Sequence, residues 1–185
     1  MNKYILFISM ILVILISNYA TLKIGSYHYN NSDKCELFDI FHKILPDLYN
    51  YHYLVDLIGL CGVVSLFFLS NESLTTEFIA KFTIIMFIRA FTIISTILPK
   101  HEVCTDTFDI RSYFLGGCYD KIFSGHTSFM LLLTLLYYRE HIINEFTLIG
   151  INAINILLIL ATRSHYTVDI LLAIFVSTTI YNVKV

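Results

Sequence analysis

Two polar stretches decide how the whole chain is read: CYDKIFSGHT at residues 118–127 and RSHYTVD at residues 163–169. Both concentrate small, polar and titratable residues, and each stands directly before an apolar run that is long enough to enter a membrane. Most of the remaining sequence is apolar and helical in pattern. We therefore predict that the two stretches meet in one site, which apolar helices hold in place.

The composition indicates a membrane protein with one domain. The chain has 185 residues, 57% of them hydrophobic, and a mean hydropathy of +0.72, which does not fit an ordinary soluble domain. A formal charge of −2 without any block of Lys or Arg excludes nucleic acid as an expected partner. With two prolines and no repeat of fixed period, we expect one compact domain over residues 1–185.

Apolar runs of about 17 to 25 residues predict six transmembrane helices. The runs lie at residues 4–24, 53–70, 77–98, 123–139, 146–162 and 167–183. The fourth and fifth are short and partly polar, so we expect them to pack against protein rather than lipid on all sides. The fold class is therefore predicted as all-α, a polytopic six-helix bundle. The first run is interpreted as a retained anchor, because it is longer than the apolar region of a usual signal peptide.

The connections between these runs alternate in character. The polar motifs fall in the connections at residues 25–52, 99–122 and 163–166, whereas those at 71–76 and 140–145 are short. Because consecutive spans reverse direction, the first, third and fifth connections share one side of the membrane. The predicted site residues therefore meet without a further assumption.

The side of the membrane that holds the site is harder to assign. The even-numbered side carries four Lys or Arg residues, namely Lys3, Lys81, Arg139 and Lys184, and the site side carries seven. The positive-inside rule would place the site in the cytoplasm. Several site-side cations stand beside the motifs, however, and we interpret them as ligand-binding. We expect an exoplasmic or lumenal site, in the Golgi, endoplasmic reticulum or plasma membrane.

Cysteine usage adds a hint about the compartment. Cys35, Cys104 and Cys118 fall in connections on the site side, whereas Cys61 lies within a predicted span. In an oxidising compartment Cys104 and Cys118 could form a disulfide that closes the loop before the site and stabilises it by roughly 2–4 kcal/mol. Free thiols are an equally good interpretation.

The segment from Ser124 to Thr127 has the properties of an anion site. A small residue and Gly125 allow the backbone to approach a ligand, and the helix that follows offers unpaired N–H groups. His126, with an ordinary pKa near 6.5, suits proton donation to a departing oxygen. A helix N-cap followed by an interfacial histidine is the alternative interpretation, and the tetrapeptide alone does not decide between them.

His165 and Asp169 are four residues apart, which on a helix places both side chains on one face. A carboxylate can then fix the imidazole tautomer, so that the other ring nitrogen attacks phosphorus or takes a proton. The same spacing suits a pair of metal ligands. Because no further His or Cys follows at ligand spacing, we expect no metal and no cofactor.

Arginine and lysine residues near the motifs are candidates for phosphate binding. Arg163 offers a planar fork matched to phosphate oxygens. Arg89 lies inside an apolar run, where a charge indicates function by default; a structural ion pair with an acid such as Asp56 is the alternative. Asp120 and Lys121, next to the first motif, complete the substrate-binding set with Arg89, Arg163, Ser124 and Gly125.

These motifs resemble those of the sphingomyelin synthases and inositol phosphorylceramide synthases, within the type 2 phosphatidic acid phosphatase superfamily. The family carries Cys-Gly-Asp leading into Ser-Gly-His-Thr, which residues 118–127 match with Tyr119 in place of glycine. It also carries Arg followed by His-Tyr-Ser/Thr-Ile/Val-Asp, as in residues 163–169. Two shorter motifs are similar to residues 45–47 (LPD) and 89–99 (RAFTIISTILP). The lipid phosphate phosphatase pattern fits less well.

The resemblance implies a six-helix membrane fold and a two-step transfer. His165 would attack the phosphorus of a phospholipid, Asp169 would orient it, and His126 would act as acid to the diacylglycerol leaving group. Ceramide would then take the phosphorylated head group, with His126 as base. Lipid phosphatase or phospholipase C activity at the same residues, and a non-catalytic membrane scaffold, stay open. The head group and the oligomeric state are not indicated.

Overall fold

The computed structural model describes residues 3–29, 37–98 and 119–184, with the side chains of residues 28 and 29 left out. Within these ranges the chain is helical and contains no strand, so the prediction of an all-α protein is confirmed. The predicted pairing of Cys104 with Cys118, like Cys35, lies outside the described residues. Cys61 is an exposed free thiol.

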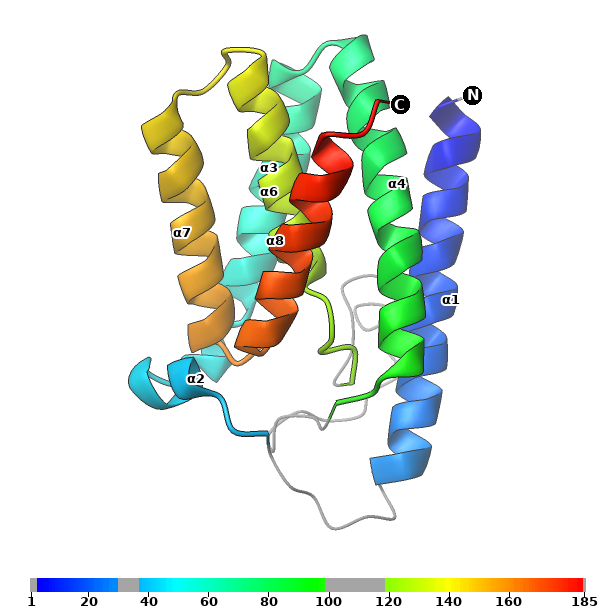
Figure 1. Cartoon of the computed structure of the whole chain (residues 1–185), viewed down its shortest axis with the longest axis vertical. Coiled ribbons are helices and arrows are strands. Elements are labelled where there is room, and N and C mark those ends of the chain that lie inside the picture. The colour runs from blue at the N-terminus through cyan, green and yellow to red at the C-terminus, as the bar shows by residue number, and fades with distance from the viewer. Residues whose placement is uncertain (1–2, 30–36, 99–118, 185) are drawn as a thin grey trace.

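In the described part of the chain, six long helices run roughly alongside one another (Figure 1). Each predicted apolar run coincides with one of them, and the ends differ by up to five residues. Their bounds are α1 (Lys3–Tyr29), α3 (Tyr53–Leu69), α4 (Glu72–Ser95), α6 (Gly125–Arg139), α7 (Glu145–Ala161) and α8 (Thr167–Tyr181). The connection between α1 and α3 contains the short helix α2 (Ile40–Ile44) and a 3₁₀ turn (Tyr49–Tyr51).

The helical segments fall into two length classes, and α3 belongs to the longer class only together with the 3₁₀ turn before it. Among the described residues, three segments are long and apolar enough to cross a bilayer: Lys3–Tyr27, Tyr49–Leu69 and Glu72–Ser95. Helices α6, α7 and α8 have 15, 17 and 15 residues, which corresponds to about 22–26 Å against a hydrocarbon core of about 30 Å. The expected six spans are therefore met in length and composition by three helices only. This pattern is compatible with an integral membrane protein.

Side-chain caps explain where several helices begin. Asn71, Ser124 and Asn144 each accept a hydrogen bond from the backbone N–H three residues on, at 2.8, 3.3 and 2.9 Å. A cap of this kind stabilises a helix by about 1 kcal/mol. The cap at Ser124 starts α6 two residues later than the apolar run predicts, because the hydroxyl ends the loop there.

The core lies where α6 packs between its neighbours. Helix α6 contacts α3, α4, α7 and α8, and α1 packs along α4. Phe78 and Phe82 of α4 each meet the ring of Phe129 edge to face, with ring centroids 5.2 and 5.5 Å apart. Gly62 of α3 lies against Phe129, where an added Cβ would clash. The tight packing fixes how α6 is placed, and with it the residues that precede it.

The alternating helix directions bring the long connections to one end of the bundle, opposite both chain termini (Figure 1). The described parts of these connections are residues 37–52, 119–124 and 162–166. The short connections after α3 and α6 lie at the other end. The predicted gathering of the polar motifs at one end is therefore seen in the structure.

Candidate active site

The loop before α6 is held by backbone geometry and by its own cap. Phe123 has φ 71, a left-handed conformation that is uncommon for a bulky residue and that concentrates at functional sites. The Ser124 hydroxyl is fully buried and accepts from the N–H and the hydroxyl of Thr127, at 3.3 and 2.9 Å. The structure thus uses Ser124, which we predicted to bind phosphate, as the N-cap of α6.

Arg89 and Asp120, both predicted to bind substrate, form a buried ion pair with each other. Their closest atoms, Nη2 and Oδ2, are 2.6 Å apart. Arg89 also donates through Nε to the Phe123 carbonyl at 3.3 Å and through Nη1 to Asn18 at 3.1 Å. The alternative interpretation, a structural ion pair, agrees with this contact, but the acid is Asp120 rather than Asp56, which we gave as an example. The correct partner could not be foreseen, because it depends on how the loop folds onto α4.

Gly125, the first residue of α6, lies against this ion pair. A Cβ atom placed there would lie 3.4 Å from Nε of Arg89, at the edge of ordinary van der Waals contact. The close neighbour of this glycine in the structure is therefore the arginine that fixes the loop. Gly125 was predicted to allow the approach of a ligand.

Tyr119, which stands where the family motif has glycine, packs its side chain against α1. Its ring is 1% exposed, clusters with Leu22 of α1, and lies against Gly25, where a Cβ atom would overlap it. The missing side chain at Gly25 thus makes room for the tyrosine. The substitution alters the contact with α1 and leaves the neighbouring Asp120 in place for Arg89.

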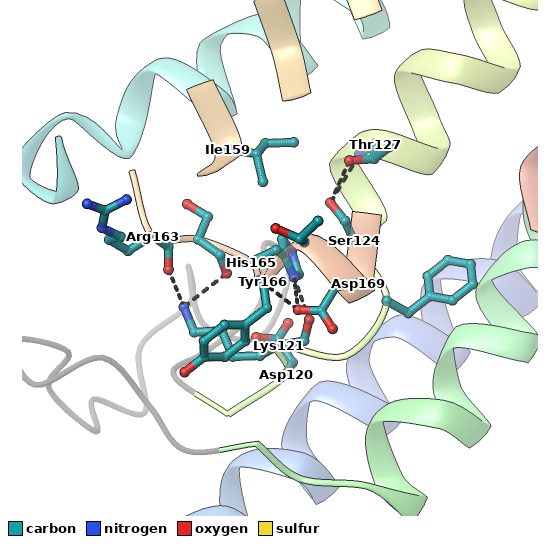
Figure 2. A network of polar contacts seen from close by, with 12 residues as sticks. Asp120, Lys121, Ser124, Thr127, Ile159, Arg163, His165, Tyr166 and Asp169 are labelled. Atoms are coloured by element: carbon teal, nitrogen blue, oxygen red, sulfur yellow. Dashed lines mark hydrogen bonds and ion pairs between the residues drawn. The ribbon is translucent and has the colours of Figure 1, made fainter. Parts of the chain in front are cut away.

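Lys121 connects the two motifs (Figure 2). Its ammonium donates to the carbonyls of Arg163 and Ser164 at 2.8 and 2.9 Å. Its own carbonyl lies 2.6 Å from Nδ1 of His165. Two carbonyl oxygens of the second motif therefore position this ammonium group, and the same residue orients the histidine.

The contact between His165 and Lys121 defines the histidine tautomer. A carbonyl oxygen only accepts, so Nδ1 of His165 carries the proton and Nε2 keeps its lone pair. We predicted that Asp169 would do this from one helical turn away. However, His165 precedes α8, and the nearest Asp169 oxygen is 3.8 Å from Nδ1, within reach of charge attraction but too long for a hydrogen bond.

Asp169 has a second function in the first turn of α8. Its Oδ2 accepts from the N–H of Tyr166 at 2.8 Å, as in a capping box. Its Oδ1 is buried and has no hydrogen-bond partner among the described residues. The carboxylate therefore serves the first turn of α8 and also lies 3.8 Å from Nδ1 of His165.

His126, the second residue of α6, faces α3. Its Nε2 is 3.3 Å from Oδ1 of Asp56, and Gly59 leaves room for the ring, because a Cβ there would lie 3.3 Å from Cδ2. The loop before His126 is tied to the other motif by a hydrogen bond from Ser124 N to Asp169 O at 3.4 Å. Asp56 was not predicted as a site residue. Its charge within an apolar run was the signal that could have indicated it.

Arg163 lies between α7 and α8 in a left-handed conformation, with φ 57. Its guanidinium donates to the carbonyls of Leu45 and Leu160, at 3.0 and 3.2 Å. Its Nε also forms a long ion pair with Asp47, with Nε and Oδ2 4.0 Å apart. As with Lys121, the bonds that position this arginine go to neutral oxygens.

The segment containing α2 also takes part in the site, which the sequence analysis did not predict. Asp39 caps α2 and accepts from the N–H and the hydroxyl of Thr167 at 2.6 and 2.9 Å. Nε2 of His42 lies 3.0 Å from the His165 carbonyl, and its ring stacks on Tyr166. Because α2 is only five residues long, it produces no clear periodicity.

The pKa values of Asp39 and His42 are shifted by these surroundings. Burial alone would raise the pKa of Asp39, but the hydrogen bonds from Thr167 and from the His42 N–H outweigh it, and the pKa is lowered. Burial lowers the pKa of His42, helped by the nearby charges of Arg163 and Lys121. At neutral pH His42 is therefore uncharged and Asp39 is ionised.

A cavity of about 420 Å³ lies between α2 and the two motifs. Three cations line it, Lys43, Lys121 and Arg163, together with the carboxylates Asp39 and Asp47 and the rings of His42 and Tyr166. With three positive and two negative side chains its wall is positive on balance, which suits an anionic group. Within the described ranges, no three His, Cys, Asp or Glu side chains are grouped to hold a metal ion.

The fold and the site define a helical bundle with two carboxylate-associated histidines and basic side chains at one end. Residues 117–185 match the family described as PAP2 superfamily C-terminal. The match includes both histidine motifs and supports membership of the PAP2 superfamily, whose members are usually phosphoryl-transfer enzymes. A comparison with curated proteins found no match.

Proposed function

We propose that this protein is a membrane phosphotransferase that moves a phospho-head group from a glycerophospholipid to ceramide through a phosphohistidine. The observation that carries the proposal is the 2.6 Å contact between Nδ1 of His165 and the Lys121 carbonyl. It leaves Nε2 as the nucleophile without any change of tautomer. The match to the PAP2 superfamily supports phosphoryl transfer in general; ceramide as acceptor rests on the motif resemblance.

In the first step, Nε2 of His165 attacks the phosphorus and forms an N–P bond. The P–O bond to diacylglycerol breaks, and protonated His126 gives its proton to the departing oxygen. Asp169, close to Nδ1 of His165, stabilises the positive charge that develops on that ring. Arg163 and Lys121 stabilise the phosphoryl oxygens through their charges.

In the second step, the primary hydroxyl of ceramide attacks the phosphorus. His126, now neutral, takes the hydroxyl proton, and the N–P bond breaks, which restores His165. Asp56 holds Nε2 of His126 in both steps, so Nδ1 is the nitrogen that faces substrate. Its carboxylate supports the protonated ring in the first step and the gain of a proton in the second.

Arg89 and Asp120 belong to the scaffold of the site in this proposal. Their ion pair holds the loop before α6 so that the Lys121 carbonyl meets His165. The site is proposed to lie on the exoplasmic or lumenal face within a single domain over residues 1–185, and the reaction requires no cofactor.

The test is reconstitution of the full chain in liposomes with fluorescent ceramide and one phospholipid donor at a time. Donors with choline, ethanolamine and inositol head groups are compared. A new phosphosphingolipid that depends on the donor supports the proposal. Release of free phosphorylated head group without that product indicates hydrolysis, and no turnover with any donor indicates a non-catalytic protein.

A further inference from the structure

The segment at residues 37–45, which contains α2, has the opposite polarity to a surface helix of a soluble protein. Asp39 and His42 point towards the protein and make the hydrogen bonds described above. Phe38 and Ile44 are 72% and 70% exposed. Polar groups inside and apolar groups outside are the arrangement expected in apolar surroundings.

The position of this segment agrees with the lengths of its neighbours. Helix α2 packs against α7 and lies across the ends of α7 and α8 (Figure 1). The Leu48 N–H donates to Ala161 O, in the last turn of α7, at 2.8 Å. Because α7 and α8 are roughly 4–8 Å shorter than a hydrocarbon core of about 30 Å, a segment that lies against their ends would be close to the boundary between acyl chains and head groups.

The start of α8, next to this segment, is apolar on the outside as well. Val168 and Leu171 are 61% and 60% exposed. Thr167, which precedes them, donates its N–H to Asp39 beside α2. The exposed apolar side chains of α2 are therefore not an isolated patch. They continue onto a helix whose own outer residues require a lipid environment.

The cavity beside α2 has both apolar and charged walls. Leu37 and Phe38 line it together with three cations and two carboxylates. The Lys43 ammonium lies 4.7 Å from the centre of the Phe38 ring, so a cation stands directly beside the apolar part of the lining. Apolar side chains next to a net positive charge match an amphiphile with an anionic head group.

We propose that residues 37–45 lie in the head-group boundary of the bilayer, with Phe38 and Ile44 among the acyl chains, and that the adjacent cavity admits the phosphodiester of a bilayer glycerophospholipid. The first part concerns the membrane position of α2 alone. The second part rests on the proposed function, because it treats the cavity as the entrance to His165 for the donor lipid.

The chain contains no tryptophan, so a single introduced tryptophan reports on its own position. Phe38→Trp and Ile44→Trp are compared with Leu60→Trp, an exposed position in the middle of α3. Each full-length variant is reconstituted in phosphatidylcholine vesicles that carry bromine either close to the glycerol or deep in the acyl chain, and iodide is the aqueous quencher.

We expect tryptophan at 38 and 44 to be quenched more by shallow than by deep bromine, and only weakly by iodide. Leu60→Trp should show the reverse order of the two bromine positions. Strong iodide quenching without bromine quenching at 38 and 44 would overturn the proposal. A depth profile at 38 and 44 like that of Leu60→Trp would overturn it as well. Because the two positions are tested separately, loss of folding in one variant leaves the other as a test.

A second measurement addresses entry of the donor lipid. Ile44→Asp, compared with Ile44→Leu, should raise the surface concentration of donor needed for half-maximal rate by about tenfold, with the maximal rate kept, since a charge is disfavoured among acyl chains. An unchanged concentration dependence would overturn the role in entry. If the depth profile is as expected but the protein has no turnover, the proposed function fails and the position of α2 stands. If the protein is active but the tryptophans are exposed to water, the position of α2 fails and the proposed function stands.

Discussion

At the end of the bundle opposite the site, charged side chains pair with each other, whereas at the site end two cations are positioned by neutral carbonyls. Glu77 is 2.8 Å from Lys81 and 2.7 Å from Arg139. At the site end, Lys121 and Arg163 donate to backbone carbonyl oxygens at 2.8–3.2 Å. Carboxylate partners cancel a positive charge, while carbonyl partners only orient it.

The comparison shows how similar residue types serve different purposes in one bundle. The ion pair between Glu77 and Arg139 joins α4 to α6. Lys81 of α4 also donates to Tyr181 O at the end of α8, at 2.6 Å. At the other end, Lys121 and Arg163 are oriented by carbonyl oxygens and line the cavity, an arrangement that suits a phosphoryl group. The site end also holds two residues with positive φ, Phe123 and Arg163, and the open acceptor of Asp169. Changes at the site end should therefore affect rate, and changes at the opposite end should affect stability.

The largest effect is expected for His165→Ala. Turnover should fall by about 10³-fold or more, because the nucleophile is lost, while helix content and thermal stability are kept. The measurement is donor-dependent product formation in liposomes. The matched control at the opposite end is His141→Asn, since asparagine tolerates the φ of 58 at that position; it should leave the rate unchanged. Wild-type turnover in His165→Ala would contradict the assignment of the nucleophile.

Asp56→Asn should have the next largest effect, a fall of about 10- to 100-fold in the maximal rate. The amide still contacts His126 but no longer carries the negative charge. A purely structural role would lower stability and leave the maximal rate of the folded protein unchanged, so the rate and the thermal midpoint are measured together. We expect the maximal rate to fall while the thermal midpoint is kept, with Asp56→Glu restoring part of the rate. Full activity would mean that Asp56 does not act through His126.

Much of the bundle was predictable because its signals are local. Apolar runs located the long helices, and reversal of direction at each connection placed the motifs around His126 and His165 at one end. Partners between helices were not predictable, since they depend on how each helix is rotated about its axis. For this reason we predicted that Arg89 binds phosphate or pairs with an acid such as Asp56, whereas its partner in the structure is Asp120.

The segment containing α2 escaped prediction for a different reason. Five helical residues are too few for a periodic pattern, and Asp39 and His42 acquire meaning only when Thr167 and the His165 carbonyl are folded against them. The motif predicts His165 as the nucleophile, and that role stays a prediction. The carbonyl of Lys121 that orients its ring was not predicted, because a backbone carbonyl leaves no trace in the residue type.

Lys81→Met should lower stability without changing chemistry. The substitution removes the ion pair with Glu77 and the bond to Tyr181 O, and charged hydrogen bonds of this kind contribute about 2 kcal/mol. The measurement is the thermal midpoint in detergent, together with the rate in liposomes at a temperature where the variant is folded. Lys81→Arg should keep most of the stability. A fall in the rate of folded Lys81→Met comparable to that of Asp56→Asn would break the division between the two ends.

The smallest expected effect is a pH dependence of stability due to His42. Its folded pKa lies below the ordinary value near 6.5, so the unfolded chain binds the proton more readily. The stability from neutral His42 is fully present above about pH 6.5 and is lost as pH falls towards the folded pKa. The thermal midpoint of the wild type should exceed that of His42→Gln more at pH 7.5 than at pH 5.5. An equal difference at both values would contradict the shift; Asp39 stays ionised in this range and cancels in the comparison.

The central claim is that His165 carries the phospho-head group between donor and acceptor. The most direct measurement is mass spectrometry of protein quenched with base after incubation with donor phospholipid in the absence of ceramide. A phosphorylated head group attached to His165, removed on addition of ceramide and missing from His165→Ala, is the predicted result. A protein that forms phosphosphingolipid while His165 stays unmodified, or that carries the group on another residue, would contradict the account.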